Sequence, residues 1–245
     1  MSAAPSAPSR PGLARSIRLF RLFLVEQTEP DRFYTALAAD SVDQLRRYTE
    51  LDGRTLLDVG GGPGYFGRAF AATGARYLGL EIDAASDGPV EITSLRGSGE
   101  AIPLRTATVD VAYSSNVVEH VARPWTLADE MVRVTRPGGL VYLSFTPWFS
   151  PWGGHETAPW HLVLGGRGAR ARYRRRTGHE PKNRFGETLF GYRVGQLRRW
   201  ARECPDADIV AFFPRYHPRW AWWIARVPGL RELAVWNIVV VLRRR

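Results

Sequence analysis

The chain has 245 residues, of which 44% are hydrophobic and 24% are charged, so it is long enough to bury a sizeable core. This composition excludes a disordered chain and a collagen-like repeat, and the single cysteine, Cys204, excludes an internal disulfide. The net charge of +10 is uneven, because residues 1–150 hold 15 basic and 17 acidic side chains and residues 151–245 hold 19 and 7. Eight of the nine tryptophans also follow residue 147, so we expect the second part to face an anionic or amphiphilic partner.

The two ends of the chain carry apolar segments, so each must be tested as a signal peptide, a membrane-surface helix or a transmembrane helix. Residues 1–12 read as a disordered leader, and residues 13–50 as a helical segment that begins with a basic amphipathic helix over residues 13–25. Arginines interrupt that helix, so we expect it to pack across the domain rather than act as a secretory signal, with a membrane-surface helix as the alternative. Residues 220–242 contain central charges, which favours a turn or short helix and then a strand over a transmembrane helix. We therefore expect a cytoplasmic protein and leave open peripheral contact with the inner face of the plasma membrane.

Short apolar runs alternate with helical patterns from residue 54 onward, which is typical of a doubly wound α/β sheet with mostly parallel strands. We expect strands over residues 55–59, 77–82, 90–95, 110–114, 140–145, 208–213 and 234–242, and helices over residues 65–72, 125–135 and 192–203. Residues 51–146 then form the ligand-binding core and residues 191–245 the C-terminal part of the sheet. Residues 147–190 are rich in Gly, Arg, Trp and His without periodicity, which predicts an inserted basic, aromatic cap or long loop.

A cluster of glycines follows the first predicted strand, directly after Asp58. Glycines at this place let the backbone approach a ligand, and the next helix offers its free N–H groups, so we expect a nucleotide-like ligand. Residues 62–67 also match the GxGxxG dinucleotide pattern, with Glu81 at a suitable later distance. Asp58 favours a cationic ligand over a dinucleotide, because a pyrophosphate would meet a like charge there.

These residues resemble the first motif of class I S-adenosylmethionine-dependent methyltransferases of the methyltransferase domain 11 kind, an acidic residue followed by Gly-x-Gly-x-Gly. The matching positions in this chain are Asp58, Gly60, Gly62 and Gly64. Later stretches resemble further parts of the family in order, namely Glu81, residues 100–104, residues 115–121 and residues 136–139. The resemblance implies a seven-stranded Rossmann-like sheet, S-adenosylmethionine as the cofactor, and a Glu81 carboxylate that accepts hydrogen bonds from both ribose hydroxyls.

Two positions depart from patterns known in such enzymes. Where the family often has an acidic residue against adenine, this chain has Ser98 and Gly99, and we expect these two residues to contact adenine through a hydroxyl and a backbone N–H. In some quinone-biosynthesis O-methyltransferases, an acidic residue three positions before a Glu-His pair helps to bind a divalent metal. This chain has Asn116 at that position, so no metal site is predicted, and Asn116 is expected to contact the amino acid end of the cofactor.

The Glu-His pair itself, Glu119 and His120, follows the fourth predicted strand at the mouth of the sheet. His120 is a candidate to take a proton from a hydroxyl acceptor, because an imidazole titrates near neutral pH. The competing interpretation is that both residues only form the pocket wall.

Candidates for binding the acceptor lie in the cap and in the tail, namely Trp148, His155, Arg215 and His217. Arginines there are suited to a phosphate or carboxylate and tryptophans to an acyl chain or interface, whereas a packed aromatic core with ordinary loop histidines is the alternative.

We therefore expect a methyltransferase that acts on an oxygen atom of a small-molecule or lipid-like acceptor, with an anionic membrane surface as a further partner. The aromatic tail and the 33 arginines against one lysine make the chain similar to actinobacterial methyltransferases connected with envelope glycolipids, including trehalose mycolates. Methylation of RNA or protein is the second hypothesis, but it is favoured only by the basic run at residues 170–176, and no nucleic-acid-binding motif accompanies it. The third hypothesis is a membrane-associated scaffold that kept the cofactor fold without turnover.

Overall fold

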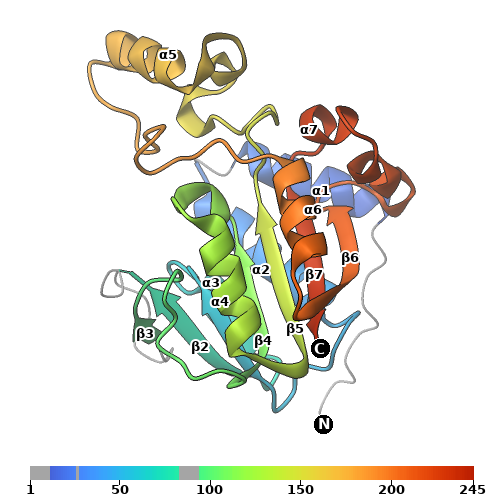
Figure 1. The fold of residues 1–245 in the computed structure, drawn as a ribbon. Helices are drawn as coiled ribbons and strands as arrows, with labels where there is room; N and C mark the ends of the chain where they lie inside the picture. The colour runs from blue at the N-terminus through green and yellow to red at the C-terminus, as the bar shows by residue number, and fades with distance from the viewer. Residues whose placement is uncertain (1–11, 26–27, 83–93) are drawn as a thin grey trace.

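The computed structural model describes residues 12–25, 28–82 and 94–245, and its centre is one seven-stranded sheet (Figure 1). The strands are β1 Thr55–Val59, β2 Arg76–Glu81, β3 Ser94–Arg96, β4 Val109–Ser115, β5 Thr135–Phe145, β6 Ala207–Pro214 and β7 Ile238–Arg244. Their order is β3-β2-β1-β4-β5-β7-β6, with β1 to β5 parallel and β7 antiparallel to both β5 and β6. The predicted doubly wound, mostly parallel sheet is confirmed.

Helices cover both faces of the sheet, which explains the nearly continuous apolar runs of its central strands. On one face lie α4 Pro124–Val134 and α6 Val194–Glu203, which pack with one hydrophobic cluster (Figure 1). On the other face lie α2 Pro30–Leu45 and α3 Tyr65–Ala71, with a second cluster. Since all five parallel strands point the same way, their carboxyl ends form one edge at which ligands of such sheets bind.

The first helix, α1 Leu13–Leu24, packs against the domain as expected. Its Arg15 is buried and forms an ion pair with Asp40 of α2, and Leu19 is fully buried. Phe20 and Phe23 contact the ring of Trp152 in the loop after β5. Because the ion pair and these rings hold α1 in place, the packed-helix interpretation is supported over a helix lying on a membrane.

The C-terminal part contains the 3₁₀ helix η3 Arg219–Arg226 and the short helix α7 Leu230–Ala234 before the last strand. The predicted order of a turn or short helix and then a strand is confirmed, although β7 begins at Ile238 rather than at residue 234. Across the three described ranges, none of the helices is both long and apolar enough to cross a bilayer.

Residues 147–190 differ most from expectation, because this segment contains the 3₁₀ helix η2 His155–Thr157 and the helix α5 Trp160–Thr177. The sequence hides α5 because its apolar residues gather in the first turn, arginines fill the rest, and the helix bends at Gly165, where φ is 66°. Ion pairs from Arg170 to Glu180 and Glu187 join α5 to the chain that follows it. The helix projects beyond the carboxyl edge of the sheet (Figure 1).

Candidate active site

A cavity of about 530 Å³ opens at the carboxyl edge of the sheet, where β1, β2 and β4 end. It is lined by Val59, Gly60, Leu80, Glu81, Ile82, Gly97, Ser98, Gly99, Glu100, Val117, His120, Val121, Ala122 and Leu127. Five predicted site residues are therefore in one cavity, namely Gly60, Glu81, Ser98, Gly99 and His120. Its apolar walls, including Ile82 and Val117, were not predicted, because an aliphatic residue at a strand end carries no signal of its own.

The glycine turn after β1 is shaped by backbone conformations that favour glycine. Gly60, Gly62 and Gly64 have φ of 78°, 62° and 87°. A Cβ on Gly60 would lie 2.5 Å from a methyl carbon of Val117, so the wall can close there only around glycine. The Gly62 N–H donates to Oε1 of Glu81 at 2.6 Å, which fixes the carboxylate at the end of β2 against the turn. Gly62 and Gly64 are not among the lining residues, and their contact with a cofactor stays a prediction.

Asp58 lies behind this turn rather than in the cavity wall. Its side chain is 1% exposed, and its Oδ2 accepts a hydrogen bond from the hydroxyl of Tyr77 at 2.9 Å. Burial raises the pKa of the Asp58 carboxyl to about 7, with the nearby Glu81 adding to the rise and the Tyr77 hydrogen bond opposing it. A cation in the cavity would favour the ionised form, which agrees with the predicted preference for a cationic ligand.

The segment before residue 100 brings backbone rather than a carboxylate to the cavity. Ser98 Oγ accepts the N–H of Glu100 at 3.1 Å, so its hydroxyl is partly used within the turn. A Cβ on Gly99 would lie 2.8 Å from Leu127 and 2.9 Å from Val59, so only glycine fits. Both residues line the cavity as the adenine hypothesis requires, and the contact itself stays a prediction.

Asn116 follows β4 with a φ of 58°, but it does not line the cavity. Its Oδ1 accepts a hydrogen bond at 2.7 Å from the side-chain amide of Asn237, which precedes β7. The predicted contact with the cofactor's amino acid end is therefore untested.

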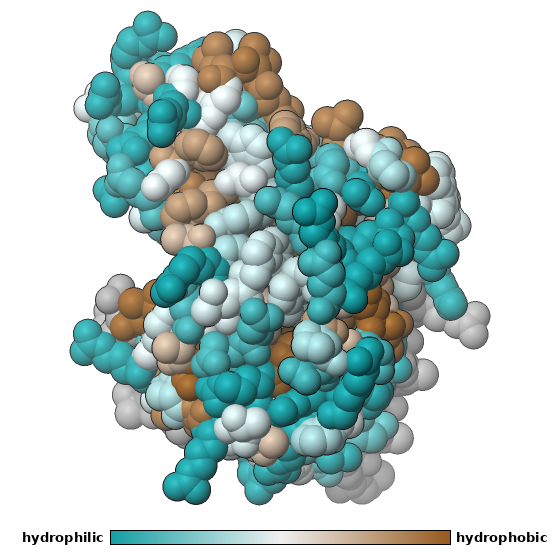
Figure 2. All heavy atoms as spheres, in the orientation of Figure 1, coloured by the Kyte–Doolittle hydropathy of each residue, from teal (hydrophilic) through white to brown (hydrophobic). Residues whose placement is uncertain are grey.

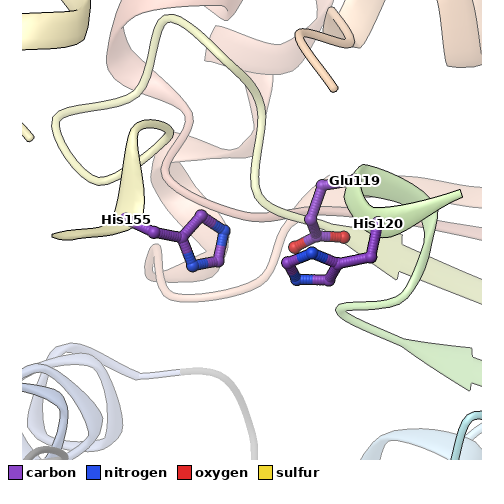
Figure 3. A group of neighbouring side chains, drawn as sticks. All are labelled: Glu119, His120 and His155. Atoms are coloured by element: carbon purple, nitrogen blue, oxygen red, sulfur yellow. The ribbon is translucent and has the colours of Figure 1, made fainter. Parts of the chain in front are cut away.

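Glu119, His120 and His155 form a cluster beside the cavity, and each offers a possible ligand atom within 4.8 Å of the other two (Figure 3). Glu119 is 1% exposed; its Oε1 accepts the N–H of Thr146 at 3.0 Å, whereas its Oε2 has no hydrogen-bond partner. His120 Nδ1 lies 2.7 Å from the carbonyl oxygen of Thr188, which fits an Nδ1–H donor and leaves the Nε2 lone pair available. The sequence did not join His155 to this pair, since 35 residues separate His155 from His120.

Burial sets the protonation of two members of this cluster. It raises the pKa of the Glu119 carboxyl, against the opposing effects of His120 and of backbone hydrogen bonds. Burial, together with smaller effects of the neighbouring His120 and His161, lowers the pKa of His155 to about 4, so the His155 imidazole is neutral near pH 7. The buried Nε2 of His155 also has no partner.

A tight turn after β5 places His155 there. A Cβ on Gly153 would lie 2.2 Å from the carbonyl oxygen of Trp148, and a Cβ on Gly154 would lie 2.4 Å from the ring of His161. His155 itself has a φ of 48°, a strained conformation for a residue other than glycine. His161 holds the turn, because its Nε2 lies 2.9 Å from the carbonyl oxygen of Trp148. The glycine pair before His155, just after a central strand, is the sequence signal that points to this geometry.

Two of the residues predicted to bind the acceptor, Trp148 and His217, lie outside the cavity wall. Trp148 is buried with its ring against His161 and Phe185, so it supports the turn and does not line the cavity. His217 is half-buried against the ring of Trp236. Neither position brings a side chain to the Glu119–His120 pair in this structure.

Arg215 is fully buried, and here the structure contradicts the expected contact with an acceptor. Its guanidinium donates to Ser41 Oγ at 2.5 Å and to Ser115 Oγ at 2.7 Å, beneath the end of the sheet. The neighbouring aromatic residues suggested an exposed basic surface, but α2 supplies internal partners that only the fold reveals. The correction is that Arg215 joins α2 to β4 from within.

Residues 188–190, at the end of the cap, reach back to the Glu-His pair. The Phe190 N–H donates to the Glu119 carbonyl oxygen at 2.7 Å, beside the contact between Thr188 and His120. Backbone contacts of this kind have no sequence signature, so these supports were not predicted.

Comparison with known proteins agrees with this geometry. A family model described as a methyltransferase domain matches residues 57–143. A protein of Mycobacterium avium (strain 104) named "uncharacterized methyltransferase" is 53% identical over 247 aligned positions, which cover 96% of each chain. A protein of the same name from Mycobacteroides abscessus is 50% identical over 252 positions, again covering 96% of each chain.

Solved structures resemble the fold across most of the chain. An S-adenosylmethionine-dependent methyltransferase from Mesorhizobium loti superposes with a TM-score of 0.55 at 23% identity, covering 85% of this chain and 98% of its own. A geranyl diphosphate methyltransferase solved in complex with S-adenosylmethionine superposes with a TM-score of 0.54 at 16% identity, covering 98% and 94%. At these identities the likeness supports the fold alone.

Proposed function

We infer the reaction from one premise: this chain belongs to the S-adenosylmethionine-dependent methyltransferases. We propose that it transfers the methyl group to a hydroxyl oxygen of a small-molecule or lipid-like acceptor, and that this acceptor is an envelope glycolipid of the trehalose mycolate class. The observation that carries the proposal is the position of His120, on the wall of the cofactor cavity and next to the buried Glu119.

The cavity residues fit S-adenosylmethionine. The Gly62 N–H fixes the Glu81 carboxylate at the end of β2, and we propose that this carboxylate accepts the ribose hydroxyls and that Ser98 and Gly99, in the cavity wall, contact adenine. The buried Asp58 carboxyl favours a ligand that carries positive charge, which a sulfonium and an ammonium group supply. Asn116 is proposed to meet the amino acid end of the cofactor from the end of β4.

The reaction requires alignment and the removal of one proton. The bound cofactor supplies a sulfonium methyl group, so that as the acceptor oxygen bonds to the methyl carbon, the carbon–sulfur bond breaks and its electron pair neutralises the sulfur. In the metal-free protein, His120 Nε2 takes the hydroxyl proton, because Thr188 holds Nδ1 and thereby fixes the tautomer. The Glu119 carboxylate stabilises the imidazolium that forms, and His155 is proposed to flank the acceptor from the turn after β5.

The surface around this end of the sheet supports a lipid-like acceptor. Figure 2 shows hydrophobic residues gathered over the first turn of α5 and over α7, which lie beyond the carboxyl edge. Val163 is 76% exposed and Trp220 is 72% exposed, and Leu233 of α7 is also largely exposed. Exposed tryptophan and aliphatic side chains beside arginines are suited to an anionic membrane interface.

Two further observations support the interfacial position. The guanidinium of Arg172 lies 4.0 Å from the ring centre of Trp160, so a basic side chain from the second half of α5 meets the aromatic residue at its start. The relatives reported above come from Mycobacterium and Mycobacteroides, which is consistent with the resemblance to glycolipid-linked actinobacterial enzymes. Methylation of RNA or protein remains the competing hypothesis, and it rests on the basic residues of α5 alone.

Transfer of a labelled methyl group from S-adenosylmethionine into a mycobacterial lipid extract tests the proposal. We expect label in a glycolipid fraction, and a loss of at least 100-fold in turnover for His120→Gln, the lower end of the usual contribution from general acid–base catalysis. His179→Gln, at an exposed histidine beyond the end of α5, is the matched control and should keep full turnover. Label in RNA or protein, with none in lipid, would overturn the assigned acceptor.

A further inference from the structure

Outside the cofactor cavity, the Oε2 atom of Glu119 is a buried carboxylate oxygen without a hydrogen-bond partner among the described residues, which costs free energy that the contacts so far described do not offset. The Glu119 side chain is 1% exposed. A buried carboxylate oxygen without a partner is strongly unfavourable, so such an atom calls for a proton, a cation or another unseen partner. In the same cluster, the buried Nε2 of His155 also has no hydrogen-bond partner among the described residues.

We propose that Glu119, His120 and His155 bind a divalent transition-metal cation of the zinc type. One carboxylate oxygen and two imidazole nitrogens form a set with mixed N and O donors that such cations prefer, and this set leaves further positions open for an acceptor oxygen. Imidazole donors argue against magnesium or calcium, which select oxygen ligands.

The distances fit a site that closes with small side-chain movements. The three ligand atoms lie within 4.8 Å of one another, and the rings of His120 and His155 have centres 5.1 Å apart. Two atoms bound to one zinc ion at about 2.1 Å each lie about 3.4 Å apart in a tetrahedral site, so shifts on the order of an ångström complete the site. Figure 3 shows the His155 ring directed toward Glu119 and His120 from a different loop.

The surrounding contacts are of the kind that orient metal ligands. A ligating histidine usually donates its second ring N–H to a carbonyl or carboxylate, and His120 Nδ1 lies 2.7 Å from the carbonyl oxygen of Thr188. The other oxygen of Glu119 is held by the Thr146 N–H. The strained turn at His155 fixes the third ligand, and strain of this kind gathers at functional sites.

The sequence predicted no metal because Asn116 stands where some related enzymes have an acidic ligand. The structure supplies a replacement from another element, since His155 of the turn after β5 completes the set while Asn116 bonds to Asn237. With the cation bound, His120 is a ligand and no longer the base. A cation held by these residues would help an acceptor hydroxyl to lose its proton to solvent, so that its oxygen could bond to the methyl carbon as the carbon–sulfur bond breaks and its electron pair passes to sulfur.

Titration of the tag-free, chelator-treated full chain with zinc and with cobalt tests the site. We expect one equivalent of zinc by calorimetry and, with cobalt, visible absorption of a four- or five-coordinate ion. His155→Ala should weaken zinc binding at least tenfold, the lower end of the loss seen even for residues that only support metal ligands. The matched control His179→Ala should bind zinc like the unmodified chain.

Gly154→Ala provides a second variant that keeps all three ligands. Its Cβ would meet the His161 ring at 2.4 Å and move the turn, so zinc binding should weaken although no donor atom is lost. Zinc binding that is absent, or that is equal in the unmodified chain and His155→Ala with both folded by circular dichroism, would overturn the inference.

The metal inference and the proposed function fail in different ways. Undiminished methyl transfer by a chain that binds no zinc would remove the metal and leave the function intact. Zinc binding without methyl transfer to any hydroxyl would remove the proposed acceptor and leave the metal site intact.

Discussion

The cavity proposed for the cofactor (the cofactor region) and the site proposed for the acceptor around Glu119 and His155 (the acceptor region) meet at His120 but are built in different ways. Around the cavity proposed for the cofactor, glycines and aliphatic residues form much of the wall, and an acidic residue of the lining, Glu81, is already bonded to the glycine turn. Around Glu119 and His155, side chains form the site, and two of their polar atoms are buried without a partner. The Glu81 carboxylate of the first region already has a protein partner, whereas the second region holds buried polar atoms that still call for one.

The largest effect is expected at Asp58, the carboxyl behind the glycine turn. The pKa of this carboxyl is about 7 in the folded chain and 3.8 ordinarily, so on raising the pH it ionises in the unfolded chain before it ionises in the folded one. The free energy of unfolding therefore falls as the pH rises from about 4 to about 7. Each unit of pKa difference corresponds to about 1.4 kcal/mol, so the fall is on the order of 4 kcal/mol. Urea unfolding across this pH range should show a flatter profile for Asp58→Asn.

Glu203→Gln is the control for this prediction, because Glu203 is an exposed carboxylate on α6. Its pH profile should match that of the unmodified chain. A steep profile that persists in Asp58→Asn would mean that the cofactor region is not where the pH dependence of stability arises.

The next effect separates the two regions directly. Glu81→Ala should weaken S-adenosylmethionine binding by about 1.5–3 kcal/mol, or roughly 10- to 150-fold, because hydrogen bonds to a charged group are lost. Glu81→Gln keeps an acceptor oxygen and should lose less. Calorimetry of both variants checks the order, and an unchanged affinity in Glu81→Ala would place the ribose elsewhere.

The smallest effect is expected on the exposed surface of α5, which we propose faces the membrane. Val163→Glu should weaken binding to anionic vesicles on the order of tenfold, because it replaces an exposed aliphatic side chain by a charge that anionic lipid repels. Ile209→Glu, at an exposed aliphatic residue of β6, is the matched control and should sediment like the unmodified chain. Equal loss in both variants, or none in either, would argue against α5 as the membrane-facing element.

The same contrast between local backbone patterns and long-range packing explains which parts of the fold and of the site the sequence predicts. β1 was predicted with its observed bounds, and the first glycine of the turn, Gly60, lines the cavity, because short-range backbone requirements leave a pattern in neighbouring residues. β5 starts at Thr135, but its register against β4 shifts after that residue, and continuous pairing with β4 and β7 begins at Leu140, where the strand was predicted to start. The predicted turn at Pro137 and the two glycines corresponds to this irregular stretch, in which Gly138 has a φ of 77°.

Long-range packing accounts for what the sequence could not provide. Arg215 was assigned to the surface because its neighbours are basic and aromatic, but its partners Ser41 and Ser115 come from distant elements. His155 meets Glu119 only because β4 and β5 are neighbours and the turn after β5 folds back. The helix α5 was missed because its amphipathic pattern is weak and its arginines form ion pairs with the segment that follows.

The hydrogen bonds from residues 188–190 link the position of α5 to the Glu119–His120 pair. Thr188 contacts the His120 ring and Phe190 bonds to the Glu119 backbone, and both residues follow the segment that is paired to α5 through Arg170. A lipid surface that binds α5 more tightly in one position of this segment would therefore change the affinity of the site around His120 for its acceptor. Thermodynamic reciprocity requires the converse, so an acceptor bound beside His120 would change the affinity of α5 for the lipid surface by the same factor.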